Sequence, residues 1–335
     1  MKVLVTGGAG FLGRYIVERC LERGYEVAIF QRSAAPELAG RGVEVQRGSL
    51  TDQQAVERAV YGCDAVFHVA ALAGIWGPYE TYFDVNVRGS RHVLQACRHH
   101  HVRYLVHTST PSVVFNRQAF AGADESLPYG HSWLGPYAET KAIAEQEMLA
   151  AHRAREVEVC ALRPHLIWGV GDPHLLPRVV ERARQGRLRI VGDGQNRVDI
   201  TRVENAADAH LLALDALQAG RAGGKAYFLS QGEPVQLWPW VNDILQRLDV
   251  PPLKRHISLK TAYNLGAVAE KLWQALRLKG EPPMTRFVAL ELAKDHWFDI
   301  SAARRDLGYQ PENHPTEAGV AQWVAHYRKE APGLA

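Results

Sequence analysis

The sequence predicts an α/β fold in which a doubly wound parallel sheet carries a smaller C-terminal domain. Three observations predict it: strands and helices alternate from residue 3 to residue 162, a glycine-rich loop follows the first strand, and the alternation stops at Pro164. Strands and helices that follow one another in turn are typical of a parallel sheet covered by helices on both faces.

Each element follows from its hydrophobic period and from the residues that bound it. Short β-branched runs such as 3–5 predict strands, and Arg23-Gly24 ends the first helix. The predicted strands are 3–5, 25–30, 43–45, 65–69, 104–108 and 157–162, and the predicted helices are 15–21, 52–61, 83–100 and 137–151. The chain therefore begins with a strand–loop–helix–strand unit, the first part of a parallel sheet.

The composition is that of an ordinary globular protein with nearly balanced charge. The 335 residues include 39 basic and 36 acidic side chains, for a net charge of +3, which gives no basic stripe for nucleic acid. Four scattered cysteines predict buried thiols in a reducing compartment, and we expect no metal site at the histidine run 99–101, because adjacent helical side chains diverge. Glycine is reached by Gly7, so no signal-peptide core fits before it and a cytoplasmic location is expected.

The glycine-rich loop has the form GxxGxxG, with Gly7, Gly10 and Gly13 around Phe11 and Leu12. Glycines permit a tight turn and let the backbone approach a pyrophosphate, which the N-terminus of the following helix attracts. Because the loop forms the first strand-to-helix turn of a doubly wound sheet, it predicts a Rossmann-type dinucleotide site.

The change of pattern at Pro164 predicts a division of the chain. We expect residues 1–167, with a return segment 199–230, to form the dinucleotide-binding domain. Residues 168–198 and 231–335 are then expected to form a smaller substrate domain over the carboxyl edge of the sheet.

The end of the second strand indicates which dinucleotide binds. An NAD enzyme usually places an acid there for the adenosine ribose, whereas this chain has Gln31-Arg32-Ser33. Arg32 offers a planar fork to a 2′-phosphate, and the alternative is a solvated surface arginine. The sequence therefore favours NADP(H).

Tyr137 and Lys141 lie four residues apart, on one face of a predicted helix. A free phenol has a pKa near 10, and a nearby ammonium lowers that pKa and makes the hydroxyl a usable general acid or base. Chance spacing is the alternative, but hydroxyls at the preceding strand end favour a site. Alternation places Thr108, Thr110 and Ser112 on one side there, although such hydroxyls also cap loops.

Together these segments resemble the extended short-chain dehydrogenase/reductase family over nearly the whole chain. Besides the glycine loop and Tyr137/Lys141, the matching segments are His68-Val69-Ala70-Ala71, Val85-Asn86-Val87-Arg88-Gly89-Ser90, Leu162-Arg163-Pro164, Gly192-Asp193-Gly194, Phe298-Asp299-Ile300-Ser301 and Leu307-Gly308-Tyr309-Gln310-Pro311.

The resemblance implies a role for each matching residue. Tyr137 would be the proton donor, Lys141 its electrostatic partner and a cofactor ligand, and Thr110 the catalytic hydroxyl, with Ser112 towards the substrate. Residues expected to line the cofactor are Leu50, Ala70, Asn86 and Pro164. Ser49 departs from the family, which usually has an adenine-binding Asp at that position.

Within the family, the chain is most similar to the 3β-hydroxysteroid dehydrogenase branch, and there to bacterial 2-alkyl-3-oxoalkanoate reductases of long-chain olefin biosynthesis. The segments that carry this are 108–113, 163–169 and 203–207. The resemblance implies an oxidoreductase that reduces the 3-oxo group of a hydrophobic 2-alkyl-3-oxo acid, or runs the reverse reaction. A hydroxysteroid or dihydroflavonol-type dehydrogenase, and a non-catalytic dinucleotide-binding sensor or scaffold, remain alternatives.

Two further segments bear on the substrate and on partners. Trp76, His165 and Trp168 follow strand ends and are expected to border the crevice, where aromatic rings suit a long hydrocarbon; packing between domains is the alternative for the tryptophans. The segment 257–278 is apolar around much of its circumference, so it predicts ordinary packing, a lid, a homo-oligomer contact or a membrane- or partner-facing helix.

Overall fold

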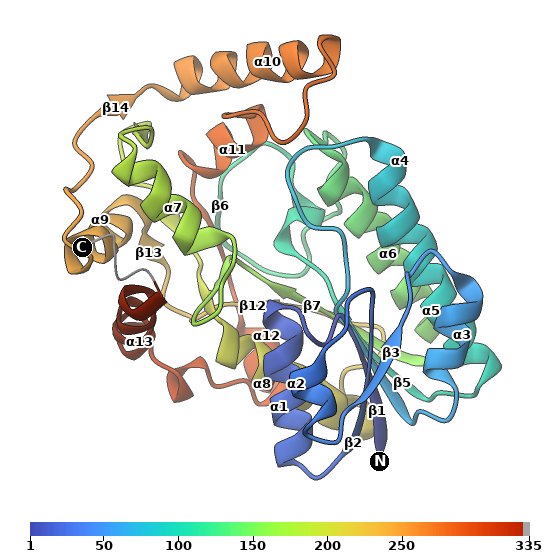
Figure 1. Ribbon diagram of the computed structural model, residues 1–335. Coiled ribbons are helices and arrows are strands. Elements are labelled where there is room, and N and C mark those ends of the chain that lie inside the picture. The colour runs from blue at the N-terminus through green and yellow to red at the C-terminus, as the bar shows by residue number, and fades with distance from the viewer. Residues whose placement is uncertain (331–335) are drawn as a thin grey trace.

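A computed structural model describes residues 1–330 and has a parallel sheet of seven strands at its centre (Figure 1). In spatial order the strands are β12 (Ala226–Leu229), β7 (Glu158–Pro164), β5 (Tyr104–Thr108), β4 (Ala65–His68), β1 (Lys2–Thr6), β2 (Glu26–Gln31) and β3 (Glu44–Arg47). From β1 the chain builds outward to β2 and β3 on one side, and then from β4 onward on the other. This reversal beside β1 creates a crevice at the carboxyl ends of the strands.

Helices cover both faces of this sheet, as the alternating sequence predicts (Figure 1). On one face lie α1 (Phe11–Glu22), α8 (Val203–Gln218) and α12 (Ser301–Leu307). On the other lie α3 (Gln53–Val60), α5 (Gly89–His99) and α6 (Pro136–Arg153). Apart from the edge strand β3, the strands are largely buried on both faces, which explains why they read as apolar runs.

The strands and helices predicted up to residue 162 are confirmed, with ends that shift by a few residues. The predicted helix 83–100 begins as a π-helix, η1 (Phe83–Arg88), before α5 continues it. Sequence reasoning missed α2 (Pro36–Ala39), α4 (Tyr79–Tyr82), the 3₁₀ turn η2 (Pro111–Val114) and β6 (Phe120–Ala123). Each is too short to show a hydrophobic period.

The C-terminal part consists of short strands and helices. A four-stranded sheet has the order β13 (Val235–Gln236), β10 (Arg197–Val198), β15 (His296–Phe298) and β6, and two small pairs join β11 (Thr201–Arg202) to β8 (Ile167–Trp168) and β14 (His256–Ile257) to β9 (Ile190–Val191). The helices are α7 (Leu175–Arg184), α9 (Leu237–Arg247), α10 (Leu259–Ala275), α11 (Arg286–Glu291), the 3₁₀ turn η3 (Pro311–Asn313) and α13 (Thr316–Glu330).

A separate hydrophobic cluster holds these elements together, with buried residues drawn from 168–200 and 237–324. Helix α12 does not join it: Ala303 and Leu307 pack with the cluster on the α1/α8 face of the large sheet, and Tyr309 follows them. Part of the segment that the sequence assigned to the substrate domain therefore packs on the sheet.

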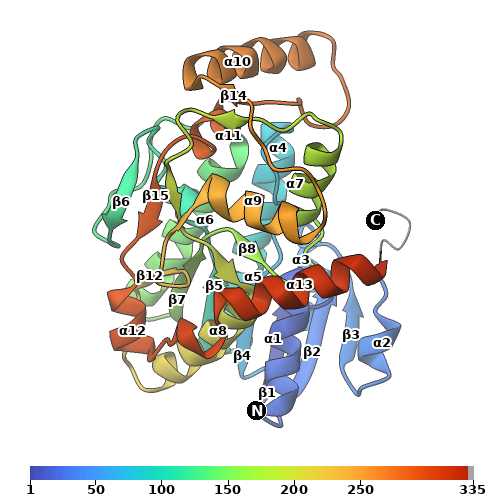
Figure 2. The same cartoon turned by 90° about the vertical axis from the view of Figure 1, so that its left-hand side faces the viewer.

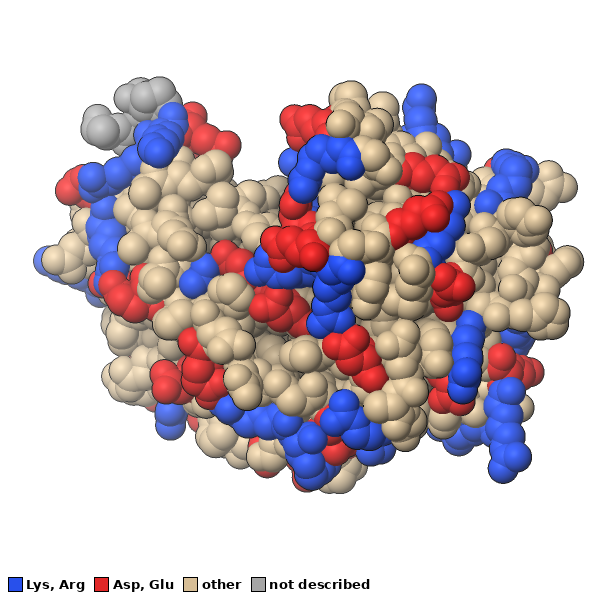
Figure 3. Space-filling view, turned by 90° about the horizontal axis from the view of Figure 1, so that it is seen from below, with Lys and Arg blue, Asp and Glu red and all other residues tan. Residues whose placement is uncertain are grey.

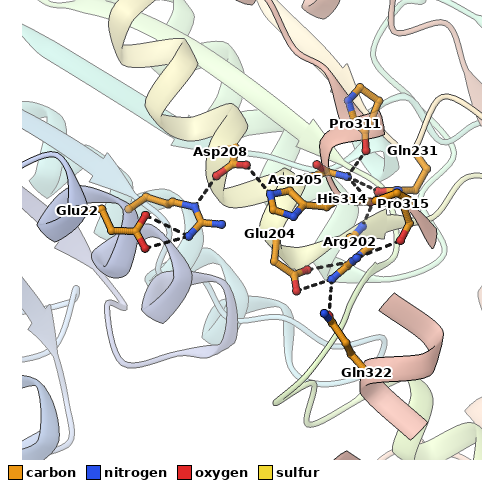
Figure 4. Close-up of polar contacts among 11 residues, drawn as sticks. Glu22, Arg202, Glu204, Asn205, Asp208, Gln231, Pro311, His314, Pro315 and Gln322 are labelled. Atoms are coloured by element: carbon orange, nitrogen blue, oxygen red, sulfur yellow. Dashed lines mark hydrogen bonds and ion pairs between the residues drawn. The ribbon is translucent and has the colours of Figure 1, made fainter. Parts of the chain in front are cut away.

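A buried polar network fixes helix α13 to the start of α8 (Figure 4). The guanidinium of Arg202 donates to Glu204 at 2.6 Å, to the backbone oxygen of Pro315 at 3.0 Å and to Gln322 at 2.9 Å. A Cβ added at Gly319 would lie 2.6 Å from Nε of Arg202, so only glycine allows this approach. The C-terminal helix is thus anchored to the α8 side of the large sheet.

Helix α10 lies at the outer edge of the molecule (Figures 1 and 2). One face, with Ala262, Gly266 and Glu270, is buried and packs on α11. The opposite side exposes the large apolar side chains of Leu265, Val268 and Leu272, and Leu276 and Leu278, just after the helix, are also exposed. Ordinary packing therefore explains only one side of this helix, and a contact role for the segment 257–278 stays a prediction. No helix within residues 1–330 combines the length and the apolar character needed to cross a membrane.

The four cysteines are free and buried, as the sequence predicts. Burial raises the pKa of Cys20 to about 12 and that of Cys63 to about 11, so these thiols stay protonated at neutral pH. On the face shown in Figure 3, basic and acidic side chains are intermingled, in keeping with the nearly balanced net charge.

Candidate active site

The glycine loop leads from β1 into α1 and is shaped by its own backbone. Gly7 has a φ of 71° and Gly10 donates to its carbonyl at 2.8 Å. A Cβ added at Gly13 would lie 2.1 Å from the same oxygen, so no other residue fits there. Gly10 caps α1, and Phe11 and Leu12 form its first turn. This compact loop at a helix N-terminus is a cradle that fits a pyrophosphate.

Thr6 joins the carboxyl ends of β1 and β4. Its hydroxyl accepts hydrogen bonds from the backbone of Val69 at 3.0 Å and of Ala70 at 3.1 Å, and it lies 2.9 Å from Nδ1 of His68. Ala70 is thereby held against the loop, because a Cβ at Gly7 would lie 3.2 Å from it. The structure thus places Ala70 beside the glycine loop, where the sequence expected it.

Asn86, in the π-helix, shapes the segment that follows β4. Its Oδ1 accepts from the backbone of Leu72 at 2.7 Å, and its Nδ2 donates to the carbonyl of Leu72 and to the hydroxyl of Thr140, both at 3.1 Å. Asn86 therefore ties this segment to α6, and its side-chain contacts are all to the protein itself.

Leu50 lies at the other side of the same crevice. It is buried, and a Cβ at Gly89 would lie 2.7 Å from its Cβ, so α5 begins in direct contact with it. The carbonyl of Leu50 is 2.8 Å from Nδ1 of His92. Ser49, which stands where the resembling family has an acid, is 2.8 Å from the hydroxyl of Thr51.

The end of β2 carries basic groups close to the glycine loop. Gln31 turns back, and its Oε1 accepts from the backbone of Ala9 at 2.8 Å. The side chain of Arg32 is exposed, and Nε of Arg47 lies 3.4 Å from the carbonyl of Arg32. Arg14, the first residue after the loop, donates to the carbonyl of Ala9 at 3.1 Å. An anionic group beside this loop would meet guanidinium groups.

Thr110 and Tyr137 meet at the carboxyl edge of the sheet. Thr110 caps η2, accepting from the backbone of Ser112 at 3.2 Å, and the hydroxyls of the two residues are 3.3 Å apart. Tyr137 lies in the first turn of α6, after Pro136. Burial raises the pKa of Tyr137, and a hydrogen bond with Thr110 opposes this rise. The expected lowering of this pKa by Lys141 is therefore wrong here: desolvation prevails, and the phenol is protonated at neutral pH.

Lys141 lies one helical turn further along α6 and contacts β5. Its ammonium nitrogen is 2.7 Å from the carbonyl of Thr108 and 3.3 Å from Nε2 of His107. Burial lowers the pKa of Lys141 to about 8, while Glu145 acts in the opposite direction. The proposed pair is thus on one helical face, but Lys141 is held by the strand that leads to Thr110.

Two buried histidines lie near this lysine and a third contacts the same strand end, and sequence reasoning did not assign them a role. His68 and His107 pair in register across β4 and β5, with ring centroids 5.4 Å apart, and His210 lies 2.8 Å from the hydroxyl of Thr108. Burial lowers the pKa of His68 to about 3 and that of His210 to about 4, and it holds that of His107 well below its ordinary value. All three are neutral. The equivalent positions of His68 and His107 on two neighbouring strands were the signal available in the sequence, whereas His210 lies on helix α8.

The residues expected around the substrate occupy different environments. Pro164 ends β7 beside Leu229, and His165 follows it, nearly buried. Trp76 is partly buried in the segment after β4, and its carbonyl accepts from Tyr82 at 3.2 Å. Trp168 is fully buried in the C-terminal cluster with Trp240, so its position supports packing rather than substrate contact.

The histidine run 99–101 departs from expectation. Nδ1 of His99 lies 3.1 Å and Nε2 of His100 lies 3.0 Å from the same oxygen of Glu57. The two side chains converge because α5 ends at His99 and the chain turns at His100, so they are not spaced as on a helix. The prediction that the side chains of adjacent histidines diverge is therefore wrong for His99 and His100.

Comparisons with known proteins agree on a family. Residues 4–261 match the model of the 3-beta hydroxysteroid dehydrogenase/isomerase family. A 2-alkyl-3-oxoalkanoate reductase from Stenotrophomonas maltophilia (strain K279a) is 54% identical over 93% of this chain and 95% of its own length. The sterol-4-alpha-carboxylate 3-dehydrogenase, decarboxylating, of Mus musculus is 33% identical over 98% of this chain and 92% of its own.

Among solved structures, the fold is similar to that of the UDP-glucose 4-epimerase from Thermus thermophilus in complex with NAD. The two chains are 26% identical, with a TM-score of 0.75, and the match covers 98% of this chain and 99% of that one. The crystal structure of gox2253 is also 26% identical, with a TM-score of 0.78 and 98% of both chains covered.

Proposed function

The chain belongs to the 3-beta hydroxysteroid dehydrogenase/isomerase family of oxidoreductases, and from that premise we propose that it reduces the 3-oxo group of a hydrophobic 2-alkyl-3-oxo acid with NADPH, or runs the reverse reaction. The observation that carries this proposal is the match to the Stenotrophomonas reductase over nearly the whole of both chains. The joint placement of Thr110, Tyr137 and Lys141 at one sheet edge is what such chemistry needs.

The names of two relatives describe substrates with a shared chemical feature. A 2-alkyl-3-oxoalkanoate and a sterol-4-carboxylate oxidised at carbon 3 both carry an oxygen function β to a carboxyl group, within a large apolar body. This supports a substrate class of β-oxygenated carboxylic acids.

The cofactor proposal rests on fit and charge. The glycine cradle and Ala70 accommodate a dinucleotide, and the solved UDP-glucose 4-epimerase, which shares this fold, holds NAD. A nicotinamide dinucleotide supplies or accepts the hydride when bound. The exposed Arg32 at the end of β2, where NAD enzymes place an acid, supports NADP(H) over NAD(H).

Tyr137 and Thr110 would act on the substrate oxygen. Because burial keeps the phenol of Tyr137 protonated at neutral pH, it can donate a proton to the oxygen that becomes the hydroxyl. Thr110, in contact with Tyr137, can donate a hydrogen bond to the same oxygen. Lys141, whose pKa is about 8, holds a proton that is readily exchanged near neutral pH, and the resemblance implies that it would bind the cofactor ribose.

One alternative activity has specific support. A 3-beta-hydroxysteroid dehydrogenase from Mycolicibacterium neoaurum is 33% identical over 97% of this chain, so steroid oxidation is the second candidate. A non-catalytic sensor is the third, although the contact between Thr110 and Tyr137 is of no use to one.

A turnover assay with NADPH and three carbonyl classes tests the proposal. The panel holds a long-chain 2-alkyl-3-oxo acid, a 3-oxo steroid and a UDP-4-keto sugar. We expect the acid to be reduced with the highest kcat/KM. Turnover of the steroid alone would support the second candidate, and cofactor binding with no turnover of any class would support the third.

A further inference from the structure

Two buried histidines outside the catalytic group form a hydrogen-bonded chain. Nε2 of His165, after β7, lies 2.6 Å from Nδ1 of His296, at the start of β15. Nε2 of His296 in turn lies 2.7 Å from the backbone oxygen of Glu291, the last residue of α11. Both imidazoles are buried, with exposures of 8% and 6%.

The series of hydrogen bonds ends at a backbone carbonyl, and this determines which ring nitrogens carry a proton when both histidines are neutral. A carbonyl oxygen only accepts, so Nε2 of His296 carries a hydrogen and its Nδ1 is the acceptor. Nε2 of His165 must then donate, which leaves Nδ1 of His165 as a lone pair without a proton. Among residues 1–330, the hydrogen bond of the His165 ring is the one that Nε2 makes to His296. His165 therefore has one free polar atom in a defined state.

The fold places His165 on the same side of the sheet as Tyr137. Arg163, two residues earlier on β7, forms an ion pair with Glu145 of α6. His165 shares this face, because its ring lies 5.9 Å from that of Phe298, which stacks on Phe228 beneath the guanidinium of Arg163.

His165 and Tyr137 also lie towards the same end of the sheet along the strand direction. Tyr137 is two helical turns, about 12 Å, above Glu145 towards the carboxyl edge. His165 is about 7 Å above Arg163 in the same direction. Leu290, next to Glu291, packs against Phe115 and Leu134, which flank η2 and α6. The histidine chain thus lies towards the same carboxyl edge of the sheet as Tyr137.

Two carboxyl groups lie near the histidine pair, while burial opposes an additional proton on it. The carboxylate of Glu291 lies 3.7 Å from Nε2 of His296. Asp199 accepts from the backbone of Phe298 at 2.8 Å; burial raises the pKa of Asp199 to about 6, and the hydrogen bond from Phe298 and the nearby His296 act in the opposite direction. The remaining charged neighbours, Arg163 and Glu145, neutralise each other. Burial and the neighbouring His296 hold the pKa of His165 well below its ordinary value, so the ring takes up a proton only when an anion arrives.

We propose that His165 binds the carboxylate of the substrate and that the two histidines take up one proton from solvent as it binds. The proton occupies Nδ1 of His165 and turns its lone pair, which would repel a carboxylate oxygen, into a charge-assisted donor. His296 is a positioning residue: it fixes the ring of His165 and shares the positive charge with Glu291 and Asp199. This inference rests on the proposed function, since it names the group that recognises the acid end of that substrate class.

Calorimetry measures the proton directly. The protein with its reduced cofactor is titrated with a long-chain 2-alkyl-3-hydroxy acid and with its methyl ester, a combination in which no hydride transfer can occur. The hydroxy acid, unlike a 3-oxo acid, does not lose carbon dioxide. Measurement in two buffers of different ionisation enthalpy gives the number of protons taken up. We expect uptake of protons with the acid and none with the ester, and loss of the uptake in His165→Gln.

Kinetics of oxidation separate substrate binding from chemistry. For His165→Gln and His296→Gln we expect KM for the acid to rise by roughly tenfold to a hundredfold, with kcat changed much less and the ester unaffected. In the unaltered protein, KM for the acid rises with pH while KM for the ester stays level. His326→Gln, on α13, is the matched control and should change none of these values.

Three results would overturn the inference. One is binding of the acid without proton uptake, or absence of acid binding. Another is an equal rise in KM for the acid and for the ester in His165→Gln, which indicates a structural role of His165. The third is dependence of activity on zinc with loss to a chelator, because His165, His296 and Glu291 lie close enough together to hold an ion. If proton-linked binding occurs but no acid is oxidised, the proposed function fails and this inference stands.

Discussion

The ammonium nitrogen of Lys141 lies 2.7 Å from the backbone oxygen of Thr108, two residues before the hydroxyl of Thr110. This hydrogen bond joins the helix that carries Tyr137 to the strand end that carries Thr110. The lysine is nearly fully buried, and burial lowers its pKa from 10.5 to about 8. A functional group is therefore kept at the expense of stability.

Lys141→Met should make the protein inactive yet more stable at neutral pH. Below pH 8 the folded protein holds a buried charge that the unfolded chain holds in water, so removal of the charge raises the free energy of unfolding by roughly 1–3 kcal/mol. Between pH 8 and 10.5 the unfolded chain binds more protons, so the unaltered protein gains stability and the difference shrinks.

Denaturant unfolding at pH 7 and pH 10 measures this difference. Lys271→Met, at an exposed position on α10, is the control and should show no such pH dependence. An equal loss of stability for Lys141→Met at both pH values would mean that the lysine side chain stabilises the fold whatever its charge.

Tyr137→Phe should fold normally, bind the cofactor and lose about 10²–10⁴-fold in kcat, because it removes only the proton donor. Thr110→Ser should keep much of the activity, whereas Thr110→Val should lose most of it, since the hydroxyl is what contacts Tyr137. Steady-state turnover and a cofactor titration on the same preparations separate the two effects. Full activity of Tyr137→Phe would show that the acid is a different group.

The large sheet could be predicted from the sequence because its signals are local. β-Branched runs, the glycine loop and the stop at Arg23-Gly24 each fix an element without knowledge of the rest of the fold. The C-terminal strands could not be predicted, because strands of two residues such as β10 and β13 exist only through their pairing with neighbouring strands. Helix α12 returns to the large sheet through contacts with α8 that no sequence period reveals.

Removal of the Arg32 side chain should weaken the preference for the phosphorylated cofactor. A charge-assisted bidentate contact contributes about 1.5–3 kcal/mol, so the NADPH-to-NADH ratio of kcat/KM should fall roughly tenfold to a hundredfold in Arg32→Ala. Dissociation constants from cofactor fluorescence should change in the same ratio. Arg153→Ala, at the exposed end of α6, is the control. Equal use of both cofactors by the unaltered protein would reject the role of Arg32.

Substitutions on the two sides of α10 should differ in how much they change the free energy of unfolding. Val268→Ser and Leu272→Ser alter side chains that are 57% and 48% exposed, so the free energy of unfolding should change by no more than about 0.5 kcal/mol. Gly266→Ala should cost about 1–3 kcal/mol, because its Cβ would lie 2.6 Å from the backbone carbonyl carbon of Thr285. Chemical denaturation of the three variants measures these changes in the free energy of unfolding. A large loss for Leu272→Ser would show that the exposed side of α10 is packed in solution.

The candidate catalytic residues could be named from the sequence because spacing places Tyr137 and Lys141 on one helical face. The charge state of Tyr137 could not, since it depends on how deeply the phenol is buried. His107 and His296 stand on strands that are far apart in the chain from the residues they contact, so their roles emerge only from the folded arrangement. The same holds for Trp168, whose burial follows from packing against Trp240.

The dependence of kcat/KM on alkyl chain length tests the central claim most directly. A homologous series of 2-alkyl-3-hydroxy acids is oxidised with NADP⁺ by the unaltered protein. Each buried methylene contributes about 0.8 kcal/mol, so kcat/KM should rise by up to about fourfold per methylene until the apolar part of the site is filled. A flat dependence on chain length, or turnover of UDP-sugars in place of these acids, would contradict the assignment of a hydrophobic β-oxygenated acid as the substrate.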